Sequence, residues 1–126
     1  MMNSLNALAL RQYLSAIEHE QGVSLLNEVR ANPAASRYEI YVDEVLAGFL
    51  TYRYGPNSIS LNHTEVFPEF GGKGIAQELV LFVLREAKEK NLEILPYCPY
   101  VPKVISKFKE EFLELVPENR RAEFGL

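Results

Sequence analysis

The sequence predicts a mixed α/β fold of the α+β type, with a mainly antiparallel central sheet flanked by helices. Three observations predict it. Residues 37–66 hold three runs rich in aromatic and β-branched residues, separated by short turn sequences. A glycine-rich turn then precedes an amphipathic run over 75–90. A further run with apolar residues at helical spacing occupies 5–20.

The N-terminal part is expected to be helical. The run over 5–20 predicts a first helix, and "SLLNEV" after Gly22 predicts a short second helix with Ser24 as its N-cap. "ANPAAS" then reads as a loop. The first helix could cap its own sheet or pair with another chain, so a homodimer is one of the expected states.

The middle of the chain predicts strands. "RYEIYV", "VLAGFLTYRY" and "SISLNHTEV" favour a three-stranded antiparallel meander, and Gly48 inside the second run indicates a bulge or a close approach. "LEILPYCPYV" predicts a short strand broken by Pro96, "PKVISKF" a short basic helix, and "FLELV" a last strand. The helix after the glycine turn is expected to bury one face. Its members are Ile75, Leu79, Phe82, Val83 and Ala87.

Length and composition favour one domain over 1–126, with a helical segment over 1–36 and a core over 37–116. The net charge of −4 argues against a general nucleic-acid partner, which usually meets a basic stripe. Because no apolar run approaches the roughly 18–20 residues that span a bilayer, no membrane partner is expected and the protein is predicted to be cytoplasmic. Cys98 is the only cysteine and the two histidines lie far apart, so neither a disulfide nor a metal site is expected.

The stretch "VFPEFGGKGIA" over 66–76 predicts an anion site. Glycines let the backbone approach a ligand, and a helix start leaves several N–H groups unpaired. A P-loop would need Ser or Thr after its Gly-Lys pair, but Gly74 follows Lys73. A dinucleotide fingerprint would need a parallel βαβ unit and a different glycine spacing. The turn could also be no more than a flexible start to a helix.

A resemblance narrows these alternatives. The pattern Val-x-Pro-x-x-x-Gly-x-Gly-x-Ala, formed here by Val66, Pro68, Gly72, Gly74 and Ala76, resembles the acetyl-CoA pyrophosphate loop of the GNAT superfamily of N-acetyltransferases. With "HTEV" before it and "LPYCPYV" after it, the chain is similar to the small YjdJ-type members over about 38–108.

The resemblance implies a co-substrate and its site. Acetyl-CoA, with no metal, would lie in a cleft between two splayed strands, over 62–67 and 92–96. The superfamily usually has Gln or Arg where Gly71 stands, so one side chain near the phosphates is missing. The implied cofactor-binding residues are Val66, Phe67, Gly71, Gly72, Lys73, Gly74, Ile75, Ala76 and Cys98. Lys103 and Lys107 lie four apart on one predicted helical face, so they could also meet the nucleotide phosphate, or they could be solvated lysines.

Acetyl transfer to an amine needs a proton acceptor, and His63 is the candidate. Strand alternation predicts that Ile59, Leu61, His63 and Glu65 share one face. Glu65 would then orient His63, since a neighbouring carboxylate stabilises an imidazolium, or bind the substrate amine. His63 could instead be a histidine on a mostly apolar face that bonds to backbone.

The segment "PYCPYV" supplies the other catalytic candidates. Cys98 could contact acetyl-CoA, supply a donor, accept the acetyl group, or only fill space in the core. In the superfamily a tyrosine just after this strand often protonates the departing CoA thiolate, and Tyr100 is the better candidate than Tyr97. Both tyrosines could instead be core aromatics.

The resulting expectation is an acetyl-CoA-dependent N-acetyltransferase that acts on a primary amine. The acceptor could be a peptide, a polyamine or a small metabolite. Two alternatives are a CoA-binding or interaction module that keeps this fold with little turnover, and a plain α+β scaffold without a cofactor.

Overall fold

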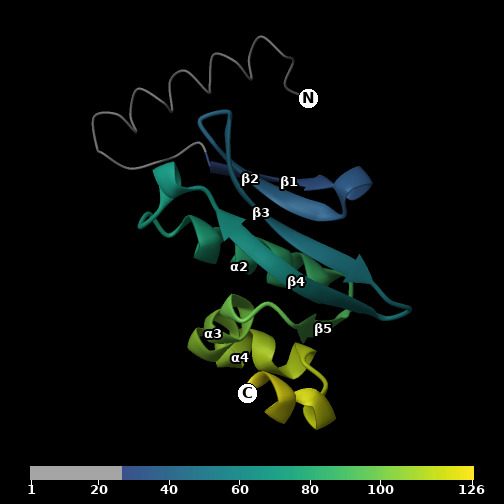
Figure 1. Ribbon diagram of the computed structural model, residues 1–126. Coiled ribbons are helices and arrows are strands. Elements are labelled where there is room, and N and C mark those ends of the chain that lie inside the picture. The colour runs from purple at the N-terminus through teal and green to yellow at the C-terminus, as the bar shows by residue number, and fades with distance from the viewer. Residues whose placement is uncertain (1–26) are drawn as a thin grey trace.

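The computed structural model describes residues 27–126, which contain a five-stranded sheet and helices (Figure 1). The strand order is β1-β2-β3-β4-β5. Neighbours are antiparallel from β1 to β4, and β5 pairs with β4 in parallel. This arrangement confirms the predicted α+β fold. The strands are β1 Asn27–Asn32, β2 Arg37–Val42, β3 Val45–Tyr54, β4 Ser58–Val66 and β5 Glu93–Pro96.

Strands β2, β3 and β4 coincide with the three predicted runs because local turns bound them. Asp43 and Glu44 both adopt positive φ, 49° and 71°, which suits a tight turn between right-twisted strands. The short strand before Pro96 is confirmed as β5. These boundaries depend on residues close together in the chain, which is why the sequence predicts them.

The antiparallel part has a fourth strand that the sequence did not predict. The expected helix "SLLNEV" is wrong from Asn27 on, and Ala31 and Asn32 of the expected loop also lie in β1. Pairing with β2 stabilises this strand, for example Val29 opposite Ile40. The helix predicted over 5–20 and its successor's N-cap Ser24 lie outside the described residues.

Helix α2, Ile75–Glu89, connects β4 to β5 and packs on one face of the sheet (Figure 1). The prediction that Phe82 belongs to its buried face is wrong, because 43% of this residue is exposed. Phe82 lies at the edge of the buried stripe, with its ring 6.3 Å from that of Tyr38. The buried residues of α2 are Ile75, Leu79, Val80, Val83, Leu84 and Ala87.

The C-terminal part is helical throughout. The predicted basic helix is confirmed as α3, Tyr100–Lys107. The predicted strand "FLELV" is wrong: Phe112 ends α4, Lys109–Phe112, a 3-10 turn follows over Leu113–Leu115, and Val116 lies just after it. Phe112 and Val116 are both buried in the core. No helix within 27–126 is long and apolar enough to cross a membrane.

Two irregularities in the sheet shape the site. The pairing of β2 with β3 skips Ala47, next to Gly48, and a Cβ atom on Gly48 would strike the Glu65 carbonyl oxygen of β4. Both a bulge and a close approach are therefore confirmed there. The pairing of β3 with β4 skips Asn62, which makes Asn62 the extra residue of a second bulge.

The bulge at Asn62 corrects the predicted faces of β4. Ile59 and Leu61 are buried, but His63 and Glu65 are exposed. One extra residue shifts the alternation, so His63 and Glu65 share a face with each other but not with the two apolar residues. The prediction that His63 and Glu65 share a face with Ile59 and Leu61 is therefore wrong.

Candidate active site

Strands β4 and β5 diverge halfway along β4. Their parallel pairing runs from Ser58 opposite Glu93 to Leu61 opposite Pro96. The Cys98 amide then donates a hydrogen bond to the Leu61 carbonyl at 2.8 Å. Beyond it, no backbone hydrogen bond within 27–126 joins residues 62–66 to the chain that follows β5. We call this opening the fork, and its two arms are residues 62–66 of β4 and the chain that follows β5.

The glycine turn follows the end of β4, which is one arm of the fork. Gly72 and Gly74 have φ of 76° and 75°, and at both positions an added Cβ would meet nothing within 4 Å. The first bond of α2 runs from the Glu78 amide to the Gly74 carbonyl at 3.1 Å, so the amides before it have no helical partner. The turn therefore presents unpaired N–H groups and open space at the positive end of a helix dipole.

A cavity of about 190 Å³ adjoins the turn. Val66 comes from β4 and Tyr100 from the start of α3, so the cavity lies between the two arms of the fork. Burial raises the pKa of the Tyr100 phenol, which keeps its proton on at neutral pH. The other lining residues are Phe70, Gly71, Gly72, Gly74, Ile75, Ala76 and Gln77.

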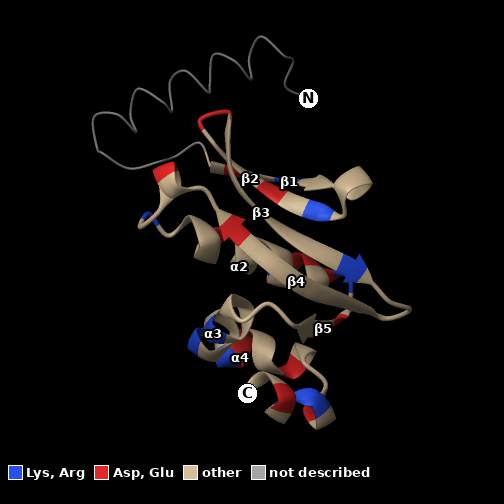
Figure 2. Ribbon diagram, in the orientation of Figure 1, with Lys and Arg blue, Asp and Glu red and all other residues tan. Residues whose placement is uncertain are grey.

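Figure 2 shows basic residues clustered on α3, but only some of them lie beside the glycine turn. The Lys107 Nζ atom donates to Gln77 Oε1 at 2.8 Å, which ties α3 to the first turn of α2. Lys73 is exposed within the turn itself. Lys103 instead lines a second cleft, so the structure brings Lys107 but not Lys103 to the glycine turn.

Cys98 lies at the closed end of the fork. It is only 4% exposed, and its Sγ atom is 3.4 Å from Thr64 Oγ1 of β4. The thiol and the hydroxyl thus join the two arms just beyond the last backbone bond. Sequence reasoning missed Thr64, although it stands inside "HTEV", because only the bulge at Asn62 turns it toward Cys98.

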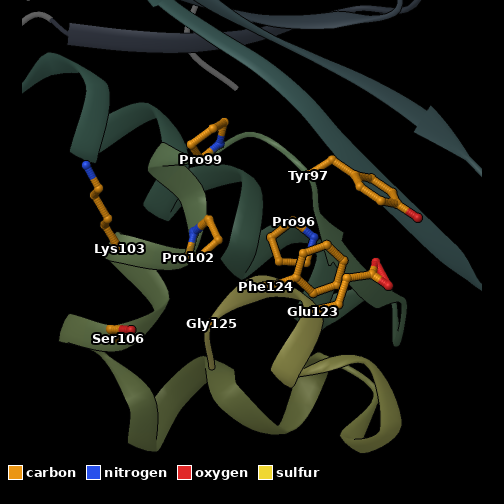
Figure 3. Close-up of a pocket in the computed structure, with 9 residues that line it drawn as sticks. All are labelled: Pro96, Tyr97, Pro99, Pro102, Lys103, Ser106, Glu123, Phe124 and Gly125. Atoms are coloured by element: carbon orange, nitrogen blue, oxygen red, sulfur yellow. The ribbon is translucent and has the colours of Figure 1, made fainter.

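Tyr97 lies on the other side of the chain that carries Cys98. It is 49% exposed and its hydroxyl accepts a hydrogen bond from Arg120 at 2.8 Å, so it is not a core aromatic. Figure 3 shows Tyr97, Phe124 and Glu123 on one wall of the second cleft, of about 420 Å³, with Lys103 and Ser106 on the other. Because Cys98 points to Thr64, residues 97–99 separate this cleft from the fork.

The sheet face turned away from α2 carries His63 and Glu65. Glu65 stands opposite Phe49 in the β3 register. The Phe49 ring lies 6.1 Å from that of His63 and 6.2 Å from that of Phe67. Phe67 thus packs on this face, and its amide is bonded to the Ala47 carbonyl, so neither its ring nor its N–H group lines the cavity beside the turn.

The site contains no metal-binding cluster: residues 27–126 hold no group of three histidine, cysteine, aspartate or glutamate side chains placed to bind an ion. What the fork brings together is a turn with unpaired amides, a phenol and a buried thiol. On the opposite face of β4 it adds an imidazole and a carboxylate. These groups suit the transfer of a group from a phosphate-bearing carrier.

The chain is similar to proteins of known structure. A GCN5-like protein from Staphylococcus aureus is 29% identical, with 67% of this chain and 82% of that chain covered and a TM-score of 0.53. A ribosomal-protein-alanine N-acetyltransferase from Brucella melitensis is 26% identical with a TM-score of 0.47. That match covers 59% of this chain and only 57% of the Brucella protein. A comparison with curated proteins gave no match.

A family model described as GCN5-related N-acetyl-transferase matches residues 37–115, which is more than half of the sequence. The match includes β2, β3, β4, the glycine turn, α2, β5 and α3, and so every part of the fork. The chain therefore belongs to the GCN5-related N-acetyltransferase family of acetyl-transferring enzymes.

Proposed function

We propose that this protein transfers an acetyl group from acetyl-CoA to a primary amine, as a small YjdJ-type member of its family in the cytoplasm. One observation carries the proposal. The glycine turn, with its unpaired amides, opens into a cavity between the arms of a fork in the sheet. A long ligand with a phosphate group at one end and a reactive group at the other fits such a site.

The residues at the turn fit the pyrophosphate of acetyl-CoA. The amides of Gly72, Lys73 and Gly74, and those of Ile75 and Ala76 in the first turn of α2, would bind it. The open space in front of Gly72 and Gly74 supports this assignment, because no side chain stands in the way. Lys107 adds a positive charge beside the same turn, and Lys103 is the weaker candidate because it lines another cleft.

The unpaired edge of β4 would bind the pantetheine arm. Residues 62–66 offer backbone groups that β5 does not use, and an extended arm could pair with them as a further strand does. Val66 lies at one end of this edge and Cys98 at the other. The thioester would then lie near Cys98 and Thr64, where the fork closes.

The proton transfers need two groups on opposite sides of β4. His63 would take a proton from the ammonium form of the acceptor and pass it to water, with Glu65 orienting the ring or holding the amine. The neutral nitrogen then attacks the thioester carbonyl, the new C–N bond forms and the C–S bond breaks. The second N–H proton leaves to water while Tyr100 protonates the departing sulfur and regains its own proton from water.

Cys98 is proposed to contact the thioester without carrying the acetyl group. A nucleophilic thiol must ionise, which requires a base or a positive charge beside it. Within residues 27–126 the partner of Sγ is the Thr64 hydroxyl, which is not a base of that kind, and the thiol is buried. Direct transfer from acetyl-CoA to the amine is therefore the proposed route.

Two measurements test the function. Calorimetry with CoA tests the cofactor site, and the release of free thiol from acetyl-CoA across a panel of primary amines tests transfer. We expect both binding and amine-dependent release. Binding without release for any amine would favour the alternative of a CoA-binding module, and the absence of binding would contradict both functions.

His63→Gln provides the matched test of the base. We expect kcat/KM near neutral pH to fall on the order of 10²-fold or more, because a general base typically contributes that much. The loss should shrink at alkaline pH, where more of the amine is already neutral. An unchanged rate with an intact fold would remove His63 from the proposal.

A further inference from the structure

Two aromatic side chains that the proposed reaction does not use lie beside its base. Phe49 of β3 and Phe67, just after β4, stand on the sheet face turned away from α2. Together with His63 and Glu65 they form a group that we call the outer cluster. Phe49 is its centre, since its ring contacts those of His63 and Phe67 and it pairs across the ladder with Glu65.

The Glu65 carboxylate gives the outer cluster a negative charge. Glu65 is exposed and makes no ion pair or side-chain hydrogen bond with any residue that the structure describes. The nearby guanidinium of Arg37 packs over one face of Phe49 at 4.5 Å, but it is paired with Glu39 at 2.8 Å. A free carboxylate beside aromatic rings is complementary to a cation with an apolar body.

The outer cluster also lies on the side of β4 that the cofactor leaves open. Val66 and Thr64 face the cavity and Cys98, whereas His63 and Glu65 face away from them. The strand therefore separates the glycine turn from the outer cluster. A second substrate can approach the fork from this face without crossing the path of the first.

We propose that the outer cluster binds the acceptor, and that the acceptor is a primary amine one or two methylene groups away from an apolar body the size of a ring. This inference rests on the proposed function. The body packs on Phe67 and on the part of Phe49 that Arg37 leaves uncovered. The ammonium group meets Glu65 and passes its proton to His63. A polyamine lacks the apolar body and is a poorer fit.

The test compares acceptors of different shape. We expect kcat/KM for 2-phenylethylamine to exceed that for ethylamine by about tenfold or more, because burying a ring-sized apolar group typically stabilises a complex by that factor. Spermidine should be no better than ethylamine. Phe67→Ala should lower kcat/KM for 2-phenylethylamine about tenfold, mainly through KM, and lower that for ethylamine far less, because ethylamine has no ring to pack on Phe67.

Phe82→Ala is the matched control. Phe82 is an exposed aromatic, whereas Phe67 is half-buried, and it lies on α2 at the opposite face of the sheet, so Phe82→Ala should change kcat/KM for neither acceptor. The wild-type comparison needs no variant, so it stands even if Phe67→Ala unfolds. Calorimetry with CoA on the same preparations reports the cofactor site independently.

The outcomes separate the inference from the function. If kcat/KM for ethylamine equals that for 2-phenylethylamine, or if spermidine is preferred to 2-phenylethylamine, the inference is overturned and acetyl transfer still stands. An equal loss in Phe67→Ala and Phe82→Ala overturns the assignment to the outer cluster. CoA binding without transfer to any amine overturns the proposed function, and the inference with it.

Discussion

The Cys98 Sγ atom lies 3.4 Å from Thr64 Oγ1, at the point where β4 and the chain after β5 begin to diverge. The two side chains come from opposite arms of the fork and meet just beyond the last backbone bond between them, from Cys98 to Leu61. Their contact marks the closed end of the site. It also gives the buried thiol a neutral hydroxyl as its neighbour.

Cys98→Ser tests whether the thiol carries the acetyl group. We expect kcat to fall by less than about fivefold, because serine keeps the contact with Thr64, whereas losing a true nucleophile typically costs on the order of 10³-fold or more. Initial rates at varied acetyl-CoA and amine should give intersecting lines. Parallel lines, or a trapped acetylated thiol in the wild type, would show a covalent route instead.

Tyr100→Phe tests the proposed acid. We expect kcat to fall about 10²-fold with CoA affinity little changed, because only protonation of the leaving sulfur is lost. Burial raises the pKa of Tyr100 above its ordinary value of 10.0. The phenol of the wild type should therefore stay protonated, and kcat should be maintained, to a higher pH than an exposed tyrosine would allow. The variant's kcat should lack that alkaline limb.

Tyr97→Phe is the control for Tyr100. It removes a hydroxyl three residues away that is bonded to Arg120, on the far side of the 97–99 segment. Its kcat should stay near that of the wild type. If the two variants lost the same activity, the loss would reflect the packing of this segment and Tyr100 would not be the acid.

The sequence predicts those parts of the fold that local residues determine. β2, β3 and β4 are bounded by turn residues, and α2 follows a glycine turn, so their limits could be read from the chain. β1 could not, because "NEV" suits a helix as well and only its pairing with β2 makes it a strand. "FLELV" was ambiguous for its length, since a short apolar run fits a strand or a helix.

Some features of the candidate site could also be predicted from the sequence, and others could not. The glycine turn and Tyr100 lie beside the fork as their sequence positions predict, because each stands at the start of a helix. The faces of His63 and Thr64 could not be predicted, since the bulge at Asn62 depends on the register with β3. Nor could the bond between Lys107 and Gln77, which depends on how α3 packs on α2.

Glu39→Gln tests a buried carboxylate beside the outer cluster. Glu39 is 6% exposed and accepts hydrogen bonds from Asn32, Arg37 and Tyr41, at 3.0, 2.8 and 2.9 Å. The bond from Asn32, with those from Arg37 and Tyr41, lowers the pKa of Glu39 below its ordinary value of 4.5. We expect the substitution to cost about 1–3 kcal/mol of stability at pH 7.

The pH dependence of that loss has a definite sign. Near and below pH 4.5 the unfolded state binds a proton at Glu39 more readily than the folded state, so the stabilisation is complete above this pH and is lost as pH falls through the lower folded pKa. Urea melts of wild type and Glu39→Gln should therefore converge in acid. Glu93→Gln, at an exposed glutamate of β5, should match the wild type, and a gap that widened in acid would contradict this account.

Gly71→Arg should tighten CoA binding. Gly71 has φ −65° and ψ 149°, which any residue can adopt, and an added Cβ would meet only the Pro68 carbonyl oxygen, at an ordinary 3.4 Å. A guanidinium at this position lines the cavity beside the turn and can pair with phosphate. We expect the Kd for CoA, measured by calorimetry, to fall about three- to tenfold, and the gain to shrink at high salt.

Gly72→Arg distinguishes the added charge from the backbone of the turn. It places the same side chain one residue later, but Gly72 has φ 76°, where a side chain strains the backbone by roughly 1–2 kcal/mol. CoA binding should therefore be weaker than in Gly71→Arg, and weaker than in the wild type if the amides move. Since a turn that only starts a helix would bind CoA no better with either arginine, unchanged affinity in both folded variants would contradict an anion site at this turn.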